Sequence, residues 1–151
     1  MRLRNIPRAE GTLQAHNIVI KRPEDQKGCW RQVFGNKQPV QIEIGTGKGR
    51  FILNMAKANP DINFVGIERY SSVLLRAVEK YDTDEFKDLQ NIRLICIDAR
   101  RIEEVFAKDE VERIYLNFSD PWPKARHAKR RLTSVEFLER YEKVLKPYGK
   151  L

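Results

Sequence analysis

Short apolar runs alternate with amphipathic helical segments along most of this chain, and this alternation restricts the fold more than any other feature. Four runs have the length and composition of β-strands and cover residues 39–44, 62–68, 92–98 and 111–118. The segments between and after them carry apolar side chains at helical spacing, which predicts helices at residues 50–58, near residues 102–106 and after Thr133. A further helix is predicted after residue 70, with Ser71 or Ser72 as its N-cap. Strands and helices that alternate in this way predict an α/β fold with a mostly parallel sheet and helices on both of its faces.

The C-terminal end of the chain departs from this pattern. A capping box at residues 133–136 predicts a helix that ends at Pro147 and Gly149 and turns five apolar residues inward: Phe137, Leu138, Tyr141, Val144 and Leu145. The chain stops at Leu151, where a fifth strand is expected to begin. We therefore expect residues 36–151 to form a core that is truncated at the fifth strand, with the C-terminal strands missing. Residues 1–35 are expected to form a basic, partly helical segment that packs on this core or extends from it.

Composition narrows the class of protein. The chain has 151 residues, of which 41% are hydrophobic, enough for one domain with a buried core. Its formal net charge is +8, and a local excess of cations indicates a polyanionic partner such as nucleic acid, with a solvated basic face as the alternative. Two cysteines are too few for a disulfide framework, and we expect Cys96 to be a small buried side chain. No run has the length of a membrane span or a signal peptide, so we expect a soluble cytoplasmic protein.

A carboxylate lies at or just after the end of each predicted strand. These residues are Glu43, Glu68, Asp98 and Asp120. Ligands of open α/β sheets bind beyond the carboxyl ends of the strands, so the four side chains are expected to converge on one crevice. Any one of them can instead cap a following helix, but all four together favour a ligand that carries several hydrogen-bond donors.

The first of these carboxylates belongs to a glycine loop, EIGTGKG at residues 43–49. Gly45 and Gly47 allow a tight turn and a close approach of backbone to ligand. A dinucleotide fingerprint would need a glycine where the chain has Arg50, and a phosphate-binding P-loop would need Ser or Thr where it has Gly49. A loop with its own acid suits a ligand with cationic, hydroxyl and amino groups and no phosphate. S-adenosylmethionine meets these demands, with Glu68 placed to hold its ribose hydroxyls.

The segment NFSDPWPKARHAKRR at residues 117–131 is the most unusual part of the sequence. Together with the glycine loop and Glu68, it resembles the bacterial tRNA (guanine-N7)-methyltransferase family, and the resemblance runs from MRLRN at the start to LKPYGKL at the end. It implies a class I, Rossmann-like methyltransferase that uses S-adenosylmethionine, without a metal, to methylate N7 of a guanine in the variable loop of tRNA. It also implies cofactor-binding roles for Glu43, Glu68, Asp98 and Asp120, a catalytic role for Asp120 and a substrate contact for Lys124. The family's further substrate residues lie beyond the end of this chain.

The chemistry of that reaction agrees with the residues present. Guanine N7 already has a free lone pair, so no histidine or cysteine is needed to activate it, and the protein has to supply positioning and electrostatic stabilisation. Pro121 and Pro123 restrict the backbone beside Asp120 and are expected to keep that carboxylate in place. Six residues after the fourth strand are expected to bind tRNA: Lys124, Arg126, His127, Lys129, Arg130 and Arg131.

Other functions stay open at this point. The tetrapeptide SDPW at residues 119–122 loosely resembles a motif of enzymes that methylate exocyclic amines, and an RNA methyltransferase of that kind is the nearest alternative. A non-catalytic RNA-binding module is the second, although it would not need an acid at every strand end. A nicotinamide oxidoreductase is the weakest, because Arg50 breaks the glycine spacing. We expect tRNA as the partner, no membrane association, and a monomer or homodimer.

Overall fold

The computed structural model describes residues 5–116 and 135–150 of the chain, and its centre is a parallel sheet of five strands. The strands are β1 Val40–Ile44, β2 Asn63–Glu68, β3 Ile92–Cys96, β4 Val111–Leu116 and β5 Leu145–Lys150. Their order is β3-β2-β1-β4-β5, and each strand is parallel to its neighbours. The first four strands begin and end within two residues of the predicted runs, except that the predicted end of the fourth lies outside the described residues.

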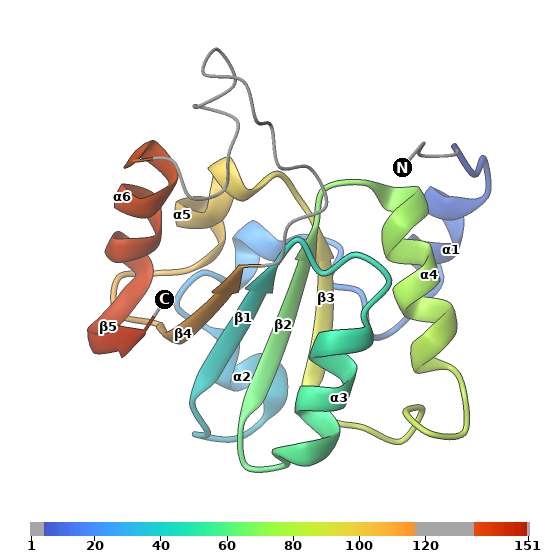
Figure 1. Ribbon diagram of the computed structural model, residues 1–151, viewed down its shortest axis with the longest axis horizontal. Coiled ribbons are helices and arrows are strands. Elements are labelled where there is room, and N and C mark those ends of the chain that lie inside the picture. The colour runs from blue at the N-terminus through green and yellow to red at the C-terminus, as the bar shows by residue number, and fades with distance from the viewer. Residues whose placement is uncertain (1–4, 117–134, 151) are drawn as a thin grey trace.

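Helices cover both faces of the sheet, as predicted (Figure 1). One face carries α1 Ala9–Ala15, α3 Arg50–Ala58 and α4 Ser71–Tyr81, and the other carries α2 Trp30–Phe34, α5 Ile102–Val105 and α6 Val135–Val144. This is the Rossmann-like arrangement that alternating strands and helices favour.

Each face has its own apolar core. On the α3 and α4 side, Leu53, Leu74 and Leu94 have no measurable exposure, and burying a side chain of this size contributes roughly 1.5–3 kcal/mol. On the other side, the indole ring of Trp30 stacks on Phe106 at 5.1 Å between ring centroids, and its Nε1 donates to the carbonyl of Val105 at 2.8 Å. The two cores thus anchor the sheet from both of its faces.

The first part of the N-terminal segment, from α1 to Val19, packs against the α4 side of the sheet and its edge, whereas α2 packs on the other face. Val19 forms a parallel bridge to Leu94, so this segment touches the outer edge of β3. Arg8 forms an ion pair with Glu79 of α4 at 3.2 Å. The N-terminal segment is therefore tied to the helix that follows β2.

Two local predictions were wrong. Neither Ser71 nor Ser72 caps α4: Tyr70 is the N-cap and makes no side-chain cap bond, and the Ser72 hydroxyl instead accepts from the Ile6 N–H at 2.8 Å. A fifth strand, expected to start only where the chain stops, is present as β5 directly after α6, so Leu145 lies in a strand rather than on the helix. Pro147 is compatible with this strand because β5 is at the edge of the sheet, where a missing N–H does not break the interior ladder.

Candidate functional site

The glycine loop connects β1 to α3 at the carboxyl end of the sheet. Gly45, Gly47 and Gly49 all have positive φ, at 80°, 58° and 82°, which is the left-handed region that residues with a side chain rarely adopt. The N–H groups of Gly45 and Thr46 both donate to the carbonyl of Ile67, each at 2.9 Å. The loop is thereby folded over the end of β2.

Glu43 and Glu68 are buried on the same face of the sheet. Glu43 is 1% exposed and Glu68 is 6% exposed. Glu43 is paired in register with Gly66, two residues before Glu68, so strand alternation points both carboxylates toward the α3 and α4 side. The two acids that the sequence placed at neighbouring strand ends therefore do lie at one site.

The Glu68 carboxylate joins two loops. Its Oε1 accepts from the Gly47 N–H at 3.0 Å, and its Oε2 accepts from the Tyr70 N–H at 2.9 Å. Because Glu68 is the last residue of β2, the carboxylate connects the glycine loop to the turn that starts α4. These two bonds fix the orientation of the side chain at the floor of the site.

Asp98 lies two residues beyond the end of β3. Its Oδ1 accepts from the Arg100 N–H at 2.9 Å, which makes Asp98 the N-cap of the 3₁₀ turn at Ala99–Arg101. Its carboxylate also pairs with Nε of Arg69 at 3.7 Å and with Nε of Arg100 at 3.9 Å. The capping role considered from the sequence is thus present, and Arg69 is a neighbour of the site that the sequence did not indicate.

Five of the predicted site residues lie at the carboxyl ends of β1 to β3: Glu43, Gly45, Gly47, Glu68 and Asp98. The other predicted site residues lie outside the described residues: Asp120, Lys124, Arg126, His127, Lys129, Arg130 and Arg131.

Cys96 is placed differently from the prediction. It is exposed, as the last residue of β3, and its thiol donates to the carbonyl of Arg69 at 3.6 Å. Its register partner is Glu68, and desolvation together with the nearby Glu68 carboxylate raises the pKa of the Cys96 thiol. The apolar run LICI suggested burial, but Cys96 is the last residue of β3 and is exposed.

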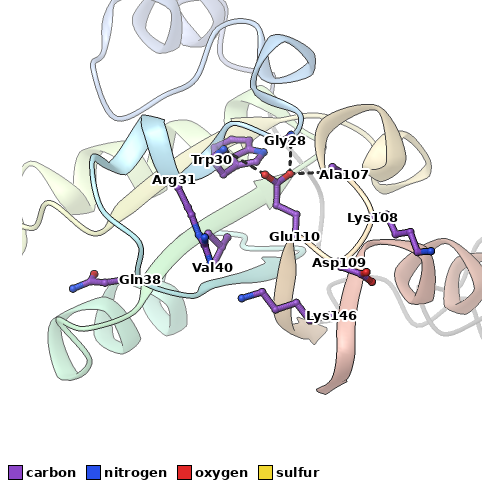
Figure 2. A pocket seen from close by; sticks show the side chains of 10 residues that line it. All are labelled: Gly28, Trp30, Arg31, Gln38, Val40, Ala107, Lys108, Asp109, Glu110 and Lys146. Carbon is purple, nitrogen blue, oxygen red and sulfur yellow. Dashed lines mark hydrogen bonds between the residues drawn. The ribbon is translucent and has the colours of Figure 1, made fainter.

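A pocket at the opposite, amino-terminal edge of the sheet has a structural explanation. It encloses about 290 Å³ beside the start of β1, and Figure 2 shows Glu110 among its lining residues. The Glu110 carboxylate accepts from the N–H groups of Gly28, Trp30 and Ala107 at 3.0, 3.4 and 2.9 Å. This acid ties α2 to the loop before β4, and none of the predicted site residues lines the pocket.

Two further classes of feature are missing from the part of the chain that the structure describes. Within residues 5–116 and 135–150, no helix is long and apolar enough to cross a membrane. Across the same ranges, His, Cys, Asp and Glu side chains form no group of three or more that is placed to hold a metal ion.

Comparison with known proteins identifies the family. The family model described as "Putative methyltransferase" matches residues 37–151. A protein of Lachnoclostridium phytofermentans named tRNA (guanine-N(7)-)-methyltransferase is 56% identical over 145 residues, which cover 96% of this chain and 66% of the relative. A Geobacillus protein of the same name is 55% identical over 152 residues, which cover all of this chain and 68% of the relative. The chain thus spans about two thirds of the length of these relatives.

Solved structures agree on the fold. The aminoglycoside resistance methyltransferase NpmB1 superimposes with a TM-score of 0.61 at 24% identity, over 80% of this chain and 57% of that one. At this identity the likeness concerns the Rossmann-like fold alone. The family model and the identity to the two curated relatives show that this chain belongs to the tRNA (guanine-N(7)-)-methyltransferases, a family of S-adenosylmethionine-dependent enzymes.

Proposed function

We propose that the whole protein transfers the methyl group of S-adenosylmethionine to N7 of a guanine in the variable loop of tRNA and forms 7-methylguanosine. The observation that carries this proposal is the pair of buried carboxylates, Glu43 and Glu68, beside a glycine loop in a chain of this family. The names of the two curated relatives support the choice of reaction and of substrate.

The residues of the site fit this cofactor. S-adenosylmethionine presents an ammonium group, ribose hydroxyls and an adenine amine, all of which donate hydrogen bonds to carboxylates. Glu68 and Asp98 are acids at the ends of adjacent strands. Gly45 and Gly47 have positive φ, which favours glycine, so no side chain at these positions blocks the approach of a ligand to the loop backbone. A pyrophosphate would be repelled by buried acids at this position, which disfavours the nicotinamide alternative.

The reaction asks for little acid–base chemistry from the protein. Bound S-adenosylmethionine supplies a methyl group on a positively charged sulfonium. Guanine N7 has a free lone pair, so no residue has to remove a proton before attack. Asp120 is the proposed catalytic residue: its carboxylate accepts hydrogen bonds from the N1–H and amino edge of the guanine and stabilises the positive charge that develops on the purine.

The basic segment after β4 is the proposed tRNA contact. The proposed contacts follow Asp120 closely in the sequence: Lys124, Arg126, His127, Lys129, Arg130 and Arg131. In this proposal they hold tRNA phosphates while Asp120 faces the base. Location in the cytoplasm, where tRNA is modified, and assembly as a monomer or homodimer belong to the same proposal.

Incubation of the full-length protein with labelled S-adenosylmethionine and unmodified tRNA tests the proposal. We expect label in the tRNA and strand scission at one guanine under chemistry specific for 7-methylguanosine. Asp120→Asn is expected to lower kcat strongly while tRNA binding persists. Label without scission would indicate methylation of an exocyclic amine. Tight tRNA binding with neither cofactor binding nor label would indicate a non-catalytic RNA-binding module, and either result would overturn the proposal.

A further inference from the structure

Gly66, in the middle of β2, is a glycine that its backbone conformation does not explain. Its φ does not lie in the left-handed region, so residues with a side chain could adopt the same backbone. A methyl group added at Gly66 would lie 2.7 Å from Oγ1 of Thr46 and 2.8 Å from Cδ2 of Leu94. Both distances are shorter than the normal contact of about 3.5–4.0 Å between non-bonded atoms. The side chains of Thr46 and Leu94 therefore leave no room for a Cβ at position 66.

The side chain over Gly66 belongs to the glycine loop. Thr46 is 3% exposed, and its hydroxyl donates to the carbonyl of Glu43 at 3.4 Å, next to Gly66 in the strand register. The Thr46 N–H donates to Ile67 at 2.9 Å. Thr46 thus occupies the space where any other residue at position 66 would place its Cβ.

Contacts on both sides of Thr46 connect this packing to the candidate site. Gly45 before it shares the Ile67 carbonyl, and Gly47 after it donates to the Glu68 carboxylate at 3.0 Å. Raising Thr46 away from the sheet would lift Gly47 from Glu68 in the same movement. The height of the loop above β2 is consequently set at Gly66.

We propose that Gly66 is a positioning residue of the cofactor site. The Thr46 side chain packs directly on the Gly66 backbone. This contact sets the distance between the glycine loop and β2 at which Glu68 and the loop backbone face the same ligand. The inference rests on the proposed function in that it takes S-adenosylmethionine as this ligand. Gly66 does not touch the ligand, and it acts through Thr46 and Gly47.

Leu94 is the other neighbour that a methyl group at Gly66 would meet, and it offers a competing explanation. Its contact is the terminal methyl group of a flexible side chain, which can rotate away. Thr46 is held by its own backbone hydrogen bond and by those of the glycines on either side, so it can retreat only with the loop. The two explanations differ in one respect: only the Thr46 explanation predicts that shortening Thr46 relieves the effect of a methyl group at Gly66.

Calorimetric titration of the full-length protein with S-adenosylmethionine tests the inference through binding alone. We expect Gly66→Ala to weaken binding by about tenfold or more, because overpacking of this kind displaces the backbone, while tRNA affinity changes by less than about twofold. Gly66→Ala combined with Thr46→Ala is expected to bind at least about threefold more tightly than Gly66→Ala alone. Gly11→Ala is the matched control, because a methyl group added there has no heavy atom within 4 Å and we expect an unchanged Kd.

Each outcome bears on a different statement. If the wild-type protein fails to bind S-adenosylmethionine, the proposed function is wrong and the inference falls with it. If the wild type binds and Gly66→Ala binds within about twofold of it, or if Thr46→Ala gives no rescue, the inference alone is overturned. If Gly66→Ala does not fold, the single variant Thr46→Ala tests the inference instead, because it removes the side chain that packs on Gly66 without adding an atom. Binding weakened by about threefold or more then supports the inference, and an unchanged Kd overturns it.

Discussion

Replacing Glu68 by glutamine separates the two roles that the structure gives this carboxylate. Both of its oxygens accept backbone N–H groups, from Gly47 at 3.0 Å and from Tyr70 at 2.9 Å. Glutamine has almost the same shape but only one acceptor oxygen, so its amide NH2 must face one of these two N–H donors. Either the glycine loop or the start of α4 therefore loses its anchor, and the negative charge disappears from the site.

The size of the effect follows from these bonds. A hydrogen bond to a charged group contributes roughly 1.5–3 kcal/mol and one between neutral groups roughly 0.5–1.5 kcal/mol. Glu68 is 6% exposed, so solvent screens the change very little. Loss of one charged bond and weakening of the other amounts to about 3 kcal/mol, which corresponds to about a 100-fold weaker Kd if the whole effect falls on the bound state.

Calorimetry with S-adenosylmethionine measures this change, and thermal unfolding without ligand shows how much of it falls on the free protein. Glu79→Gln is the matched control, because Glu79 lies on the solvent side of α4 and pairs with Arg8 and Arg76. It removes the same charge at a more exposed position away from the strand ends, and we expect its Kd to match that of the wild type. A Kd for Glu68→Gln within about twofold of the control would refute the assignment of Glu68 to the cofactor site.

Three further predictions concern the stability of the fold and the RNA contact. Asn91 Nδ2 lies 2.9–3.0 Å from three carbonyl oxygens, among which its two N–H groups are shared, so Asn91→Ala should lower the free energy of unfolding by about 2–4 kcal/mol in urea titrations. Burial raises the pKa of Tyr141 well above its usual value near 10, so its stabilising effect is complete below pH 10 and is lost as the pH rises further. Tyr141→Phe should therefore show a shallower loss of unfolding free energy in the alkaline range. Lys124→Ala and Arg130→Ala should each reduce the salt dependence of tRNA binding by about one unit of slope, and unchanged slopes would contradict the proposed phosphate contacts.

The fold could be predicted from the sequence because its signals are local. The apolar runs and the helical spacing between them depend on neighbours a few residues apart, and β1 to β4 follow them closely. The predictions that failed all depended on partners distant in the sequence. The Ser72 hydroxyl contacts Ile6, 66 positions away, and no local pattern shows that an N-terminal segment will compete for it. Cys96 lies in an apolar run but at the strand end, and its exposure depends on which distant segments pack there.

The sequence also left a choice at the strand ends between acids that bind a ligand and acids that cap a helix, and the structure suggests that the two roles do not compete. Glu68 and Asp98 both accept backbone N–H groups, and Asp98 caps the turn after β3. An ionised carboxylate has about four lone-pair positions, so two such bonds leave room for hydroxyl or amino donors of a ligand. Bonds to the backbone also fix the rotamer before the ligand arrives, which lowers the entropy lost on binding. A carboxylate anchored in this way keeps acceptor positions for a cofactor, so capping at a strand end is compatible with the proposed cofactor role.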